Sequence, residues 1–257
     1  MKFNVCYPDA NEFDHVIKIK SLEEWNVEYV PLDKDIGYWV ADNPFQNNGF
    51  EIYKKLIGTF PIQKKNNNLE CVDPNPFATI HVPTWASKPI IELIESFYVK
   101  HVNNFVSEAQ FNEWGNVYQR DARPIDKFRI PHIDYESGIV GNLWFTDHPK
   151  DSSGTKLYRY KGKIIGLYYD FQIDSDHPLY RENLNRSNRL ESWKNFSTEE
   201  ASYWGFEEVG MAPSIYSKIT MYSANVCHAP YVAEHIDFRW SHTFAFFHRS
   251  PRLGNIL

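Results

Sequence analysis

The sequence predicts a mainly β protein with flanking helices, and two observations carry this prediction. First, segments rich in β-branched and aromatic residues recur over 111–170 and 211–250, separated by Gly, Pro, Asp and Ser. Second, aromatic residues make up 16% of the 257 residues, and such side chains favour strands and pocket walls. A chain of this length buries a sizeable core, so we expect a single domain over 1–257.

The first part of the chain, residues 1–110, is expected to supply outer strands and a supporting helix. The long helix is predicted from Ser87, which would cap it, with Pro89 in its first turn and an apolar stripe at helical spacing up to Val102. Shorter elements are expected as strands at 16–19, 38–41 and 79–82, a helix at 50–57 and a surface loop at 63–68.

The core is predicted to be built from short strands on either side of a polar segment. Residues 171–210 are rich in Asn, Arg and Glu and partly helical in pattern. Because a structureless loop of this length inside a compact domain would need a function, we interpret it as an insertion or lid. The core strands are expected at 114–119, 127–134, 139–145, 156–160, 163–169, 214–223 and 240–249.

The charge balance narrows the range of partners. A net charge of −6, without a long basic stripe, disfavours binding to nucleic acid or to an anionic membrane surface. Cys6, Cys71 and Cys227 are too few and too scattered for a disulfide framework or a cysteine zinc site. No apolar run approaches the roughly 18 residues of a membrane span. We expect a cytoplasmic protein that acts on a small molecule, and leave its oligomeric state open.

The pair His132-x-Asp134 is the strongest candidate for chemistry. On an extended segment, residues two apart lie on the same face, which suits two ligands of one metal ion. Non-haem Fe(II) is typically held by two histidines and one carboxylate, which leaves positions open for substrate and oxygen. A third ligand must come from another strand. We favour His228 over His235, because His235 lies only four residues before Arg239.

A second feature accompanies the predicted metal ligands. Arg239 and Ser241 are two residues apart at the start of a predicted strand, so they are expected to share a face. A guanidinium holds a carboxylate with two parallel hydrogen bonds, and a hydroxyl adds a third. A dicarboxylate cosubstrate that chelates the metal with its other end would need such an anchor.

Taken together, His132-x-Asp134, the late His228 and Arg239-x-Ser241 resemble the Fe(II)/2-oxoglutarate-dependent dioxygenases. Gly154-Thr155 followed by Tyr158 resembles a segment of a phage and bacterial branch of that superfamily. The resemblance covers roughly residues 112–248. It implies a double-stranded β-helix core, jelly-roll or cupin-like, over 111–170 and 211–250. It also implies Fe(II) as cofactor, with 2-oxoglutarate and O2 as cosubstrates.

The resemblance also suggests roles for further residues. Asn116-x-Tyr118 is similar to a pair that several subfamilies place on 2-oxoglutarate. Halogenating relatives replace the metal-binding carboxylate with a small residue, so Asp134 favours oxygenation. Four residues are candidates for the substrate pocket, although each fits a core or surface position equally well: Trp144, Tyr158, Tyr135 and Glu136.

The sequence is compatible with three functions. The first is hydroxylation of an unactivated C–H bond of a small molecule, such as an amino acid or a natural-product intermediate. The second keeps the chemistry but acts on a protein or peptide side chain, with 171–210 as an open groove. The third is a non-catalytic barrel that binds a metabolite or serves as a phage accessory protein, in which His132 and Asp134 form a hydrogen-bonded pair.

Overall fold

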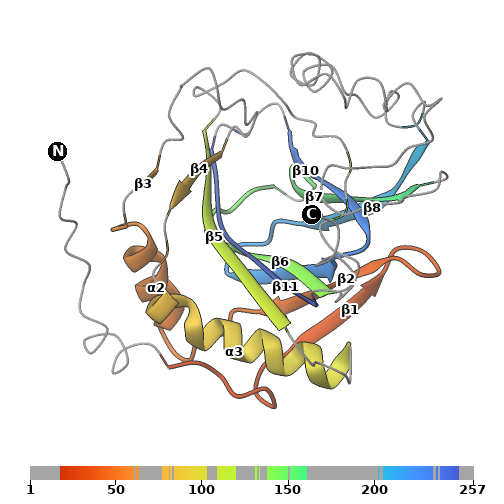
Figure 1. Ribbon diagram of the computed structural model, residues 1–257. Helices are drawn as coiled ribbons and strands as arrows, with labels where there is room; N and C mark the ends of the chain where they lie inside the picture. The colour runs from red at the N-terminus through yellow and green to blue at the C-terminus, as the bar shows by residue number, and fades with distance from the viewer. Residues whose placement is uncertain are drawn as a thin grey trace, which may run out of the picture.

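The computed structural model contains two antiparallel β-sheets with helices on one side (Figure 1). The structure describes residues 18–60, 62–63, 77–80, 82, 84–102, 109–119, 131, 133, 138–149, 151–160, 202, 205–233, 236 and 238–248.

The large sheet has the strand order β1-β2-β9-β6-β11-β5-β4-β3, and the small sheet has the order β10-β7-β8. The strands of the large sheet are β1 (Val27–Pro31), β2 (Gly37–Asp42), β3 (Ile62–Gln63), β4 (Phe77–Ile80), β5 (Ala109–Gln119), β6 (Gly138–Trp144), β9 (Lys218–Ser223) and β11 (Phe238–His248). The small sheet is formed by β7 (Ser153–Tyr160), β8 (Phe206–Pro213) and β10 (Cys227–Val232).

The order in which the chain visits the sheets gives the fold. From β6 onward the chain passes from the large sheet to β7 and β8 in the small sheet, then to β9, β10 and β11 in alternate sheets. This winding between two facing antiparallel sheets is a double-stranded β-helix of the jelly-roll type. The prediction of a mainly β fold with flanking helices and such a core is confirmed.

The two faces of the large sheet have different partners. Helices α2 (Gly49–Ile57) and α3 (Thr84–His101) cover the face that points away from the small sheet (Figure 1). On β11, the rings of His242 and Phe246 contact Tyr53 of α2 and Tyr98 of α3, at centroid distances of 6.1 and 5.1 Å. Because strand side chains alternate between faces, the odd-numbered residues of β11 point toward the small sheet.

Each helix buries one face in this outer core. The helix predicted at 50–57 is confirmed as α2, and in it Phe50, Tyr53 and Ile57 are buried at helical spacing. The prediction for α3 was wrong at its start: the helix begins at Thr84, and Ser87 is buried inside it. Pro89 accordingly lies beyond the first turn, where it removes a backbone hydrogen bond.

Several other predicted boundaries also change. Residues 206–210, expected to end the insertion, belong to β8, which pairs with β7 in the core. The strand expected from Ser214 starts at Lys218, after a turn in which Ser217 has a φ of 61°. Gln63 lies in a short strand and not in a loop. Apart from residues 202 and 205, the rest of the predicted lid lies outside the described residues, and so does the strand predicted at 163–169.

No helix in the described part of the chain is long and apolar enough to cross a membrane.

Candidate functional site

Several polar side chains are buried in the space between the two sheets. They come from the inner face of the large sheet and from β10 of the small sheet. Burying polar groups is costly unless they find partners, so their gathering at one place needs a reason beyond core packing. The members of this interior polar cluster are Asn142, Thr220, His228, Arg239, Ser241 and Thr243.

Arg239 connects the two sheets. It is the second residue of β11 and is only 6% exposed. Its Nη1 donates hydrogen bonds to the carbonyl oxygens of Gly154, at 3.1 Å, and Tyr231, at 3.3 Å. Gly154 and Tyr231 are paired in the register of β7 and β10. The guanidinium therefore reaches from the large sheet to one position of the small sheet.

His228 lies on β10 and is 4% exposed. Its Nδ1 is 3.0 Å from the carbonyl oxygen of Val226. Since a carbonyl can only accept, Nδ1 carries the proton in this contact, and the neutral ring then has its lone pair on Nε2. A hydrogen bond from the second ring nitrogen is the usual way in which a metal-binding histidine is oriented. The ring also contacts Tyr222 of β9 across the sheets, with centroids 4.7 Å apart.

Ser241, predicted to assist Arg239, lies beside Asn142 and Thr243. The Ser241 hydroxyl is 3.5 Å from Asn142 Oδ1, and the Thr243 hydroxyl donates to the same oxygen at 2.6 Å. Thr243 and Asn142 are direct cross-strand neighbours on β11 and β6. The hydroxyls thus share one amide oxygen, which fixes the orientation of the Asn142 side chain within the cluster.

Trp144, a candidate for the substrate pocket, is fully buried on β6. Its indole Nε1 donates to the Thr220 hydroxyl at 2.8 Å. Its ring lies under the Arg239 guanidinium, whose central carbon is 5.3 Å from the ring centroid. Within the described residues, the hydrogen bond and the cation–π contact of its ring are therefore both with members of the cluster.

The predicted cosubstrate pair Asn116 and Tyr118 lies on β5, next to β11. The register places Asn116 opposite Ser241 and Tyr118 opposite Arg239. Four residues predicted to act on one cosubstrate thus occupy two cross-strand pairs that are two residues apart along the strands. Their roles stay predictions.

Tyr158 lies next to Leu157, which is the cross-strand partner of His228. By strand alternation, Tyr158 faces the opposite side of the small sheet from His228. Its hydroxyl has no hydrogen-bond partner among the described residues. Burial raises the pKa of this phenol, and the nearby Glu208 charge raises it further. The structure does not bring Tyr158 to the interior polar cluster.

Other predicted site residues lie outside the described part of the chain. These are the predicted ligands His132 and Asp134, the rival His235, and the pocket candidates Tyr135 and Glu136. Among the residues that the structure does describe, no three His, Cys, Asp or Glu side chains gather in a way that would hold a metal ion. The predicted metal site is therefore represented by His228 alone.

Asn142, Thr220 and Thr243 are members of the cluster that sequence reasoning missed. Each is a polar residue within a β-branched or aromatic strand; Asn142 lies two residues from Trp144, and Thr243 lies two residues from Ser241. That spacing could have grouped them by face, but it does not reveal which face turns toward the small sheet.

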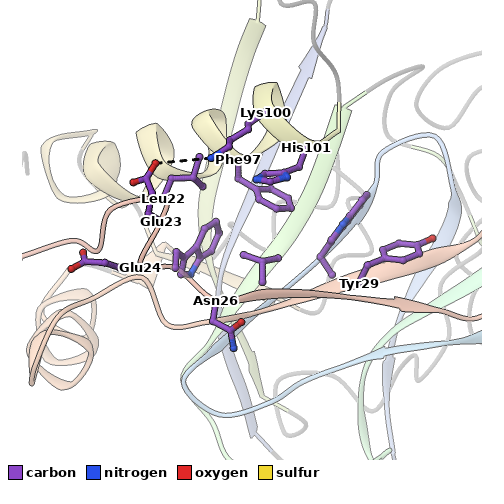
Figure 2. Close-up of a pocket in the computed structure, with 11 residues that line it drawn as sticks. Leu22, Glu23, Glu24, Asn26, Tyr29, Phe97, Lys100 and His101 are labelled. Carbon is purple, nitrogen blue, oxygen red and sulfur yellow. Dashed lines mark ion pairs between the residues drawn. The ribbon is translucent and has the colours of Figure 1, made fainter.

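A pocket of about 600 Å³ lies elsewhere, between β1, the end of α3 and residues 22–26 (Figure 2). Trp25, Trp39 and Phe97 line it, and the rings of Trp25 and Trp39 each lie at a steep angle to the ring of Phe97. At its rim Glu23 and Lys100 form an exposed ion pair at 4.0 Å. Trp25 and Phe97 belong to the core under the helices, so this pocket is separate from the interior polar cluster.

Comparisons with known proteins concern the fold. The chain resembles HygX from Streptomyces hygroscopicus, crystallised with nickel and 2-oxoglutarate, with a TM-score of 0.47 and 10% identity over 82% of this chain and 83% of that one. A HygX structure with iron gives a TM-score of 0.42 and 11% identity over 82% of each chain. No protein-family model matches the sequence, and no curated protein matches it.

Proposed function

We propose that the protein is an Fe(II)/2-oxoglutarate-dependent oxygenase that hydroxylates an unactivated C–H bond of a small molecule. One observation carries the proposal. The Arg239 guanidinium, predicted as the cosubstrate anchor, donates a hydrogen bond to the carbonyl of Tyr231, which lies on the same strand as the predicted metal ligand His228. Two residues predicted from separate motifs are thus linked through β10.

The spacing of these groups supports a dicarboxylate cosubstrate. Tyr231 is three residues from His228 along β10, which corresponds to about 10 Å at roughly 3.3 Å per residue. A five-carbon acid chelating a metal at His228 would direct its far carboxylate along this strand toward Arg239. The planar fork of a guanidinium suits that carboxylate, and the Ser241 hydroxyl lies on the same face of β11.

The predicted set of metal ligands suits iron. His228 offers a neutral imidazole nitrogen whose partner nitrogen is held by a backbone carbonyl. His132 and Asp134 would complete the set of two histidines and one carboxylate. When bound, Fe(II) would supply the activation of O2 that is coupled to decarboxylation of 2-oxoglutarate. The residues of this chain would bind and orient the cosubstrate and exclude water from the interior.

A small-molecule substrate is the finer part of the proposal. The net charge of −6 disfavours a polyanionic partner, while the aromatic content of 16% provides walls for an apolar or mixed substrate. Stimulation of succinate release by free amino acids or related metabolites would support this part. Stimulation only by a polypeptide would replace it with a protein substrate.

The test is an anaerobic titration of the protein with Fe(II) and then 2-oxoglutarate, followed by visible absorbance. We expect a weak charge-transfer band from the chelated metal in the wild type. The band should also appear in His101→Ala, a control at an exposed histidine on α3. It should be lost in His228→Ala. For Arg239→Met, the 2-oxoglutarate concentration needed to form the band should rise by about tenfold or more, because the variant loses a charge-assisted anchor.

Two results would contradict the proposal. One is the absence of any band at saturating Fe(II) and 2-oxoglutarate, which would favour a non-catalytic barrel. The other is a band that His228→Ala leaves unchanged, since His228 would then not be a ligand.

A further inference from the structure

We infer that Trp144 is a positioning residue for Arg239 and that Thr220 holds Trp144 in place for this task. The inference rests on the proposed function, because it concerns how the cosubstrate anchor is prepared. It gives Trp144 a role different from the substrate contact that the sequence suggested. The three residues form a buried chain of contacts that runs from Thr220 through Trp144 to Arg239.

Strand register explains why these residues meet. β9, β6 and β11 are consecutive in the large sheet. Trp144 on β6 pairs directly with Ser241 on β11, so Arg239, two residues before Ser241, is its diagonal neighbour. Diagonal neighbours on one face are within reach when one of them is a large aromatic side chain. On the other side, Thr220 of β9 pairs with Asn142, which lies two residues before Trp144.

Two kinds of contact then restrain the guanidinium. Hydrogen bonds from Nη1 to the carbonyls of Gly154 and Tyr231 fix the direction in which the group points. The Trp144 ring, 5.3 Å from the guanidinium carbon, adds a cation–π contact in a desolvated setting. A free arginine side chain has several rotatable bonds, and immobilising it on binding weakens affinity. Restraints that act before the ligand arrives remove that cost.

The hydrogen bond to Thr220 makes the ring itself rigid. A buried indole N–H is costly without an acceptor, and the Thr220 hydroxyl at 2.8 Å provides one. This bond selects one orientation of the ring about its side-chain bonds. Stacking also favours the planar guanidinium over the compact ammonium of lysine. The cluster is therefore built to present an arginine fork toward an anionic group.

The consequence is specific to one end of the cosubstrate. Loss of the Trp144 ring should weaken binding of a keto acid that uses Arg239 and spare one that does not. 2-Oxoglutarate has a far carboxylate, whereas 2-oxobutyrate has the same chelating end and lacks it. A general defect in folding or in the metal site would weaken both acids alike.

The experiment measures binding of both acids to the Fe(II)-loaded protein by anaerobic isothermal titration calorimetry. We expect Trp144→Leu to weaken 2-oxoglutarate binding by about tenfold, which lies within the range for a cation–π contact, and 2-oxobutyrate binding by less than about twofold. Trp144→Phe should give a smaller loss with the same selectivity, because a weaker aromatic face remains. Thr220→Val keeps the ring and should again weaken 2-oxoglutarate selectively.

Trp240→Phe is the matched control. Trp240 is next to Arg239 in sequence, but its ring packs against Phe145 on the helix-covered side, with centroids 4.7 Å apart. This variant should leave both affinities unchanged. Trp144→Phe and Thr220→Val also keep the inference testable if Trp144→Leu does not fold.

The outcomes separate the inference from the proposed function. Equal weakening of both acids in the Trp144 and Thr220 variants, or no weakening at all, would overturn the positioning role. Arg239→Met tests the proposed function: this variant should lower the affinity for 2-oxoglutarate to about the affinity for 2-oxobutyrate. If Arg239→Met leaves the preference for 2-oxoglutarate intact, Arg239 is not the anchor and the proposed function itself fails.

Discussion

Replacing Thr243 with valine removes one hydroxyl from the interior polar cluster while keeping the volume and the β-branched shape of the side chain. In the wild type this hydroxyl donates to Asn142 Oδ1 at 2.6 Å, and both residues are buried. The other described donor to that oxygen, the Ser241 hydroxyl, is 3.5 Å away and contributes little. The substitution therefore leaves a buried acceptor poorly satisfied.

The expected loss follows from the burial of Asn142. An acceptor that loses its partner in a protein interior costs about 1–3 kcal/mol, and the new methyl group offsets only part of this. We expect Thr243→Val to lower the free energy of unfolding by about 1–2 kcal/mol. The urea midpoint should fall without a change in the denaturant slope, because the unfolded chain exposes the same surface.

The assay is urea unfolding followed by tryptophan fluorescence, with Thr59→Val as the matched control. Thr59 donates a hydrogen bond of similar length, 2.7 Å, to the carbonyl of Leu56, but it is exposed at the end of α2. An exposed substitution of this kind is expected to change stability by less than about 0.5 kcal/mol. Equal effects of the two variants would refute the reasoning, since burial would then not decide the cost.

Three further predictions concern the framework around the site. Gly141→Ala should lower stability by about 1–3 kcal/mol in urea unfolding, because a Cβ there would lie 2.6 Å from the Phe244 ring and 2.8 Å from the Thr220 carbonyl. An unchanged urea midpoint would show that the sheet rearranges to accommodate the added methyl group. Asp42 accepts a hydrogen bond from Lys218 at 2.9 Å, and this bond is the main cause that lowers the Asp42 pKa. Because the folded pKa is below the unfolded one, the stabilisation is present at neutral pH and is lost as pH falls through the folded pKa. Asp42→Asn should thus cost up to about 1 kcal/mol at pH 7 and progressively less as the pH falls below the usual aspartate pKa, and a cost independent of pH would contradict the ion pair. Burial raises the pKa of the Cys227 thiol to about 12, so in a C6S/C71S background iodoacetamide at pH 8 should label it only as fast as the protein unfolds. Prompt labelling of the native protein would rule out this burial.

The strands that carry the site were predictable because their residues alternate. Both β6 and β11 are rich in β-branched and aromatic residues, and in β11 these largely alternate with small or polar ones; the sequence located both strands within two residues of their observed bounds. The placement of Arg239 and Ser241 two apart on one strand needed only that alternation. Their burial between the sheets was not local information, since it depends on β7 and β10 on the opposite side.

Other features could not be predicted from local patterns. β8 contains the exposed residues Glu207 and Glu208 and the glycine Gly210, and it follows a long polar segment, so it resembled part of an insertion. Its assignment as a strand depends on pairing with β7, a long-range contact. Trp144 was expected to contact a substrate because only its size and type were known. Its contact with Arg239 arises from cross-strand register, which a single sequence does not specify.

A structure of the protein with Fe(II) and 2-oxoglutarate bound under anaerobic conditions would test the central claim most directly. The account predicts the metal on His228, together with His132 and Asp134, and the far carboxylate of 2-oxoglutarate on Arg239 between the two sheets. 2-Oxoglutarate bound away from Arg239, or a metal that does not contact His228, would contradict it.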